Sequence, residues 1–290
     1  MAVLLASATA AAILVLSDSG QARPGALLLP QPLASLQLSS AQQMSLDHAE
    51  DVLVRRCMRV RGLDFAVAPT AATRQFTDPN PYGLLDPAVV AKQGYGLHGP
   101  TNGGAHEHAL TARESRALLG TATHEKKVRL PGGGYTVENT DGCFSQAQDK
   151  LYGLAWKPLH YGEETLFAQE LARVRHDPAV QRVESSWASC MRASGYKVAA
   201  LQNVFSDAER RIAATGTDQN AGQAVFANLW KQAQRDAACQ QKAGVLTAFR
   251  RAQNAAEPVV MRGKRGDLAR LADLRSHALA LAIQLESTDR

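Results

Sequence analysis

The sequence predicts a mainly α-helical, disulfide-bridged domain with one small β-hairpin. The motif Cys-Met-x-x-x-Gly occurs twice, at residues 57–62 and 190–195, and one further cysteine follows each copy, Cys143 and Cys239. Apolar residues recur three and four positions apart through most of the chain, which is the spacing of an amphipathic helix. Residues 128–137 instead combine two short strand-like runs with a glycine-rich turn.

The N-terminal residues predict export from the cytoplasm. Residues 2–16 carry no charge and are mostly Ala, Leu, Val and Ile. A membrane-spanning helix needs about 20 apolar residues, so this shorter run favours a signal peptide, which we place at residues 1–22. The alternative is a retained N-terminal anchor at the cell envelope. Residues 23–44 are rich in Pro, Leu, Ser and Gln and predict a flexible linker.

The four cysteines are predicted to form disulfides, because disulfides persist outside the reducing cytosol. Four cysteines allow three connectivities. The repeated order of motif and then single cysteine favours Cys57–Cys143 and Cys190–Cys239. Zinc sites and redox-active dithiols typically contain Cys-x-x-Cys pairs, which this chain lacks.

A mainly helical domain is expected over residues 45–290. The cysteine order divides it into two related halves, 45–153 and 163–245, followed by a C-terminal helical segment, 246–290. Ser45 is the expected N-cap of the first helix, and Asp177 followed by a proline is a strong start signal for a later one. Helices are predicted over 45–61, 87–92, 110–120, 178–194, 222–245 and 267–285.

Each copy of the motif also predicts how its helix ends. Gly62 and Gly195 each lie five residues after the motif cysteine, and an apolar or aromatic residue, Leu63 or Tyr196, follows each glycine. A helix that ends with a left-handed glycine has this pattern, because glycine adopts that conformation without steric cost and the next residue packs back on the helix.

Composition and charge exclude few classes of protein function. The chain is 45% apolar and 20% charged, which is ordinary for a globular protein. Its net charge of +5 is mild for 290 residues, and the charges alternate in sign. A nucleic-acid-binding protein usually gathers Lys and Arg on one face, so we expect no nucleic-acid partner. No cofactor is predicted, and the sequence identifies neither a ligand nor an oligomeric state.

The histidines His98, His106 and His108 form the one group that could carry metal chemistry. Imidazole is a good ligand for zinc or copper. However, these histidines stand in a Gly-rich segment without the helical spacing of a metalloprotease, and we expect a solvated, metal-free loop.

The tryptophans are the other candidate ligand contacts. Trp187 and Trp230 fall on apolar helix faces, which predicts core packing. Trp156 precedes Pro158 in an expected loop and is freer to face a ligand. The chain has no Gly-x-Ser-x-Gly motif, and no catalytic residues are predicted.

Several short motifs together resemble a group of uncharacterised secreted or lipid-anchored proteins of high-GC Gram-positive bacteria such as streptomycetes. They are the two cysteine motifs, Gly142-Cys143 before a helix that ends in Leu151-Tyr152-Gly153, and Asp236-Ala237-Ala238-Cys239. The resemblance covers roughly residues 45–245 and implies a secreted or lipid-anchored protein without implying an activity. The chain departs from the anchored members of the group in lacking a lipid-attachment cysteine near its N-terminus.

Together these observations favour an extracytoplasmic binding or interaction module whose partner could be a cell-envelope component. One alternative is a metal-dependent enzyme that uses the loop of His98, His106 and His108. The other is a structural envelope protein that associates through its C-terminal helix.

Overall fold

The computed structural model describes residues 33–65, 80–97, 110–130, 133–216 and 218–288. In these ranges the chain is mainly helical with one two-stranded antiparallel sheet, which confirms the predicted fold class. The expected signal peptide, residues 1–22, lies outside the described residues. The elements are α1 (Ser40–Val60), α3 (Pro87–Gln93), α4 (Ala112–Leu119), β1 (Glu125–Arg129), β2 (Tyr135–Asn139), α5 (Cys143–Tyr152), α6 (Trp156–Arg175), α7 (Pro178–Ala193), α8 (Val204–Ala213), α9 (Gln219–Ala243), α10 (Val245–Val260) and α11 (Arg265–Thr288), with short 3₁₀ turns at Ala34–Leu36, Ala122–His124 and Leu201–Asn203.

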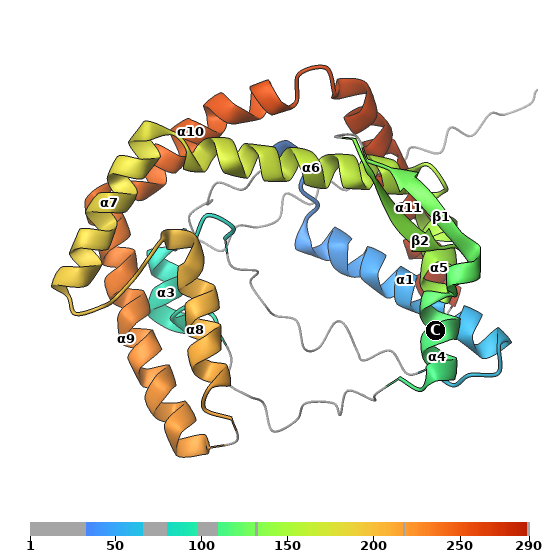
Figure 1. Ribbon diagram of the computed structural model, residues 1–290, viewed down its shortest axis with the longest axis horizontal. Helices are drawn as coiled ribbons and strands as arrows, with labels where there is room; N and C mark the ends of the chain where they lie inside the picture. The colour runs from blue at the N-terminus through green and yellow to red at the C-terminus, as the bar shows by residue number, and fades with distance from the viewer. Residues whose placement is uncertain (1–32, 66–79, 98–109, 131–132, 217, 289–290) are drawn as a thin grey trace, which may run out of the picture.

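The elements form two lobes (Figure 1). The first lobe contains α1, α4, α5, α11 and the hairpin, and the second contains α3, α7, α8 and α9. Helices α6 and α10 pack against each other and connect the lobes across one side of the molecule. Each lobe has its own cluster of buried apolar side chains, and α10 contributes to that of the second lobe.

The lobes differ from the two sequence halves expected at 45–153 and 163–245. Residues 80–97 belong to the second lobe, where Tyr82, Val90 and Tyr95 are buried. The C-terminal helix α11 belongs to the first lobe. The order of the cysteines carries no information about these exchanges, because apolar packing and not chain order decides which segments share a core.

Helix α1 begins earlier than the predicted linker allows, at Ser40 rather than after Ser45. Ser39 is the N-cap and forms a capping box with Gln42: its hydroxyl accepts from the Gln42 amide at 3.2 Å, and the Gln42 side chain accepts from the Ser39 amide at 2.9 Å. Leu33 is buried against Leu166, inside the span expected to be a linker.

The hairpin forms where the sequence predicts it, with strands of five residues each. Lys127 pairs with Val137 and Arg129 with Tyr135. Because neighbouring residues of a strand point to opposite faces, Val128 and Glu138 lie on the inner face, and Tyr135 and Val137 lie on the outer one.

Both copies of the motif end their helices in the predicted way. Gly62 has φ +69° and Gly195 has φ +87°. The amide of Leu63 donates to the carbonyl of Met58 at 3.1 Å, and the amide of Tyr196 donates to that of Met191 at 3.0 Å. These are the long bonds of a helix terminated by a left-handed glycine.

The C-terminal helix α11 packs against α1, α5 and α6. Its apolar side chains Leu271, Ala278 and Ala282 are almost fully buried by these contacts. The face that the sequence offers for association with another molecule is therefore covered within the chain. Among the described helices, none is long and apolar enough to cross a membrane.

Candidate functional site

The two disulfides join the predicted pairs. Cys57 is bonded to Cys143 with the Cα atoms 5.6 Å apart, and Cys190 is bonded to Cys239 at 5.7 Å. All four cysteines of the chain are used, so the protein carries no free thiol for redox or metal chemistry. Two disulfides are compatible with an extracytoplasmic location.

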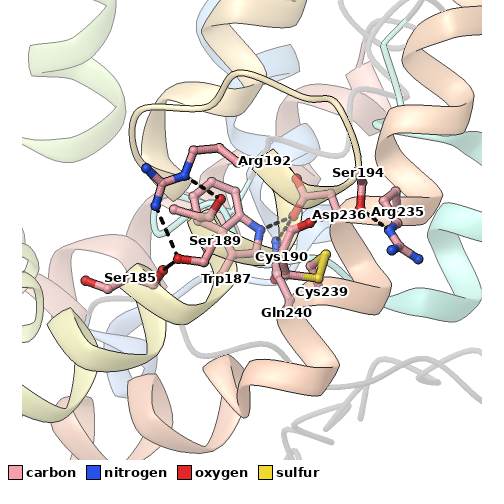
Figure 2. Close-up of a disulfide and its surroundings, with 11 residues drawn as sticks. Ser185, Trp187, Ser189, Cys190, Arg192, Ser194, Arg235, Asp236, Cys239 and Gln240 are labelled. Carbon is pink, nitrogen blue, oxygen red and sulfur yellow. Dashed lines mark hydrogen bonds between the residues drawn. A yellow bond between two sulfur atoms is a disulfide. The ribbon is translucent and has the colours of Figure 1, made fainter.

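A buried hydrogen bond lies one helical turn from the second disulfide (Figure 2). Trp187 precedes Cys190 by three residues, and Asp236 precedes Cys239 by three. The Trp187 indole Nε1 donates to Asp236 Oδ1 at 2.7 Å, and neither side chain is exposed to solvent. Helices α7 and α9 are thus fixed to each other twice within one turn.

Asp236 accepts two further hydrogen bonds, which hold residues 80–97 on α9. The Tyr95 hydroxyl donates to Oδ2 at 3.0 Å, and Gln240 Nε2 donates to Oδ1 at 2.9 Å. Gln240 also donates to the carbonyl of Gly83 at 3.0 Å and accepts from the amide of Leu85 at 3.1 Å. One carboxylate therefore connects three separate segments of the second lobe.

Burial is the main cause that raises the pKa of Asp236 to about 6, and the bonds from Gln240, Trp187 and Tyr95 act in the opposite direction. A raised carboxyl pKa can mark a catalytic acid. Here, however, both oxygens accept from protein donors and the side chain is 0% exposed. The carboxylate acts as a structural anchor, because no substrate can reach it without opening the lobe.

A second buried charge, Lys157, lies in the first lobe near the start of α6. Its Nζ is 2.6 Å from Glu138 Oε2 and 3.2 Å from Asp149 Oδ1, and it donates to Ser145 Oγ at 2.7 Å. A Ser–Lys pair could serve nucleophilic catalysis if the amine were free to accept the hydroxyl proton. The two carboxylates stabilise the charged ammonium instead, so this cluster ties the hairpin and α5 to α6.

Glu50 on α1 is another carboxyl of the first lobe whose pKa is shifted. Burial, and then repulsion from Asp47 and Asp51, raises the pKa of Glu50 to about 7. A hydrogen bond from Gln148 and the charge of Lys157 oppose the rise. Glu50 thus keeps its proton to a higher pH than an ordinary glutamate.

Trp156 does not lie in a loop, contrary to our expectation. It is the first residue of α6, is 8% exposed, and stacks between Tyr152 and His160 with ring centroids 4.3 and 4.4 Å away. The proline at position 158 misled the prediction, because proline is tolerated in the first turn of a helix.

The other two tryptophans divide between core and surface. Trp187 is fully buried as predicted, whereas Trp230 is 40% exposed. A Cβ added at Gly94 would lie 3.4 Å from the Trp230 ring, so the indole rests on the glycine that ends α3. The short helix α3 covers only part of this face of α9, which is why core packing was the wrong expectation for Trp230.

The histidines of the predicted metal alternative, His98, His106 and His108, lie outside the described residues. His124 is described and exposed, with Nδ1 3.3 Å from Asp141 Oδ2. Hydrogen bonds from Thr121 lower the pKa of Asp141. In the part of the chain that the structure describes, no three His, Cys, Asp or Glu side chains gather at metal-binding distance.

A cavity of about 250 Å³ lies between α6, the end of α10 and the start of α11. Its apolar wall includes Leu159, Leu166, Val260 and Leu268. Its charged lining residues are Glu163, Arg262, Lys264 and Asp267. Glu163 is neutralised by a two-point ion pair with Arg275. The other three charges sum to +1, so the cavity combines an apolar wall with a weakly positive edge.

Sequence reasoning did not identify the anchors Asp236 and Lys157. A signal existed for the first, because Trp187 and Asp236 each stand three residues before a cysteine of the same predicted bridge. On helices bridged at those cysteines, residues three positions earlier lie on the same face. No comparable signal pointed to Lys157 or to the cavity, whose walls come from separate parts of the sequence.

No protein-family model, curated protein or solved structure matches the chain. The resemblance to secreted streptomycete-type proteins therefore stays a prediction.

Proposed function

We propose that the protein is an extracytoplasmic binding module whose cavity between α6, α10 and α11 takes a short ligand with an apolar body and an anionic end. The observation that carries the proposal is the cavity itself, where an apolar wall meets unneutralised cations. Pockets for small molecules usually combine apolar walls with a few polar groups that fix orientation.

The use of the buried charged groups supports binding over catalysis. Asp236 and Lys157 are held by protein partners and lie outside the cavity. Glu163 lines the cavity but is paired with Arg275. Thr165, the one lining residue with a hydroxyl, donates that group to a backbone carbonyl one helical turn earlier at 2.8 Å. The cavity therefore offers contacts that can hold a ligand.

The size and charge of the cavity limit the class of ligand that it can bind. Its volume of about 250 Å³ is just below the roughly 300–1,000 Å³ of typical small-molecule sites, which favours a short chain. Lys264 is only partly exposed and, among the described residues, makes no side-chain ion pair or hydrogen bond. An anionic group on the ligand would supply the missing partner, and an alkyl chain would cover Leu166 and Leu268.

Calorimetric titration with octanoate tests this proposal, with octylamine as the cationic counterpart. We expect octanoate to bind and octylamine to bind much more weakly. Lys264→Gln should weaken octanoate binding about tenfold or more, the size of a lost charge-assisted hydrogen bond. Arg270→Gln is the matched control, because Arg270 is exposed on α11 and does not line the cavity. Equal binding of both amphiphiles, or no effect of Lys264→Gln, would contradict the proposal.

A further inference from the structure

We propose that the outer face of the β-hairpin docks on an anionic membrane surface, independently of the cavity. This hairpin face comprises Lys127 and Arg129 of β1, Tyr135 and Val137 of β2, and Leu119 at the end of α4. Figure 1 shows the hairpin at the outer edge of the first lobe, away from α6 and α10 over most of its length.

The apolar members of the hairpin face are unusually exposed for a folded chain. Tyr135 is 57% exposed, Val137 44% and Leu119 55%. Tyr135 and Val137 alternate along β2 on the side opposite the Glu138 that pairs with Lys157. Asn139, on the same side as Val137, donates to the carbonyl of Leu119 at 3.2 Å, which places the end of α4 beside this face.

The cations of the hairpin face are free of carboxylates among the described residues. The Arg129 side chain makes no ion pair or hydrogen bond among the described residues, and Lys127 lies over the Tyr135 ring, 4.5 Å from its centroid. Lys126 lies on the opposite side of β1, where its Nζ is 3.8 Å from Glu138 Oε1. On the hairpin face, Lys127 and Arg129 therefore outnumber the one acid of β1, Glu125.

This combination of groups favours a lipid surface over an acidic protein segment. An aromatic ring with a polar end is at its most stable at the boundary between water and hydrocarbon. Lysine and arginine beside it are attracted to anionic headgroups. A purely electrostatic acidic partner would leave the Tyr135, Val137 and Leu119 side chains exposed, whereas the interfacial region of a bilayer covers them.

Co-sedimentation with vesicles tests the proposal. The full chain should bind vesicles of phosphatidylglycerol and phosphatidylcholine at low salt, bind pure phosphatidylcholine at least tenfold more weakly, and lose most binding in 0.5 M NaCl, because screening acts on exposed charges. The double variant Lys127→Glu, Arg129→Glu should lower the partition coefficient at least tenfold, and Tyr135→Ser two- to fivefold.

The matched control is Lys231→Glu, Lys242→Glu on α9, which makes the same change of charge at two exposed lysines of the second lobe. This control should leave binding within about twofold of the parent, and both double variants should keep the octanoate titration of the parent, since neither pair lines the cavity. An equal loss of vesicle binding in both double variants would mean that only the net charge of the protein matters, and it would overturn the proposal. Binding of soluble polyglutamate through Lys127 and Arg129, with no binding of vesicles, would also overturn it in favour of an acidic partner.

Discussion

The two copies of Cys-Met-x-x-x-Gly behave identically at the level of the helix and differently at the level of the lobe. In both, the methionine is fully buried, the helix ends at the glycine, and the cysteine is bridged. The partner cysteines are not equivalent: Cys143 is the first residue of α5, whereas Cys239 lies in the last turns of α9. The repeat is therefore a local device for ending and bridging a helix, and the lobes around it are built differently.

The residues around the two disulfides also differ. In the second lobe, the residues three positions before the bridged cysteines are Trp187 and Asp236, which form the buried hydrogen bond. The corresponding residues in the first lobe are Val54 and Thr140. The first lobe relies instead on Arg61 within the motif, whose guanidinium donates to the carbonyls of Ala117 at 3.1 Å and Asp141 at 2.6 Å. These hydrogen bonds are only part-buried, so the segments joined by the second disulfide are held together more strongly by their other contacts.

Removing a disulfide should have the largest effect on the free energy of unfolding, and the size of the effect should differ between the two motifs. The sequence separations of 86 and 49 residues correspond to at most about 4.6 and 4.1 kcal/mol in the chain-entropy treatment. We expect Cys57→Ser, Cys143→Ser to lower the free energy of unfolding more than Cys190→Ser, Cys239→Ser, because Trp187 and Asp236 still hold α7 on α9. Urea unfolding of both variants measures this, and a larger loss for the second pair would contradict it.

The buried charges provide the next comparison. Asp236→Ala should lower the free energy of unfolding by about 3–5 kcal/mol, because it leaves three buried donors without an acceptor. Lys157→Met should cost less, about 2 kcal/mol, since its partners can turn to water. The Glu138 and Asp149 side chains are 11% and 24% exposed, in contrast to the fully buried Trp187. Chemical denaturation ranks the two variants, and the reverse order would show that the first lobe depends more on its buried charge.

The pH dependence of stability separates the lobes by their raised carboxyl pKa values. Both Asp236, at about 6, and Glu50, at about 7, bind a proton more tightly in the folded than in the unfolded chain. Each therefore contributes stability at low pH that is lost as the pH rises, for Asp236 between about 4 and 6 and for Glu50 between about 4.5 and 7, with a slope of at most about 1.4 kcal/mol per pH unit per group.

Replacing each carboxyl by the neutral amide shows which residue causes the loss of stability in each pH range. Asp236→Asn should flatten the decline below pH 6 and leave that between 6 and 7. Glu50→Gln should reduce the part that extends to 7, to which Glu170 also contributes because burial raises the pKa of that carboxyl to about 7 as well. The free energy of unfolding measured at intervals from pH 4 to 8 checks both. An unchanged profile in Asp236→Asn would mean that Asp236 is ionised in the folded protein well below pH 6.

The fold and the disulfides could be predicted because their signals are local or lie in the order of a few residues. Helix ends, the hairpin and the capping glycines depend on neighbouring residues, and the start of α1 was missed only because Ser45 was preferred to Ser39. The anchor at Asp236 could not be predicted in full, since its donor Tyr95 is 141 positions away. The position of α11 in the first lobe and the walls of the cavity likewise depend on packing between distant segments.

The smallest effects concern the motif glycines, where the two copies should respond alike. Gly62 and Gly195 both have positive φ, and an added Cβ would meet no atom within 4 Å at Gly195 and only the Arg113 guanidinium, at 3.8 Å, at Gly62. Space is therefore not limiting at either site. The cost of an alanine comes from the left-handed conformation itself, which a side chain disfavours by about 1–2 kcal/mol.

We accordingly expect Gly62→Ala and Gly195→Ala to lower the free energy of unfolding by about 1 kcal/mol each, with lower thermal midpoints. Gly222→Ala is the matched control. It lies within α9 without positive φ, and its added Cβ would make only an ordinary contact, 3.8 Å from Thr215. Since alanine is the better helix former by up to about 1 kcal/mol, the control should raise the midpoint. A higher thermal midpoint in Gly195→Ala as well would mean that α7 continues past the motif in solution. If the midpoints of Gly62→Ala and Gly195→Ala changed in opposite directions, the two copies of the motif would not end their helices in the same way.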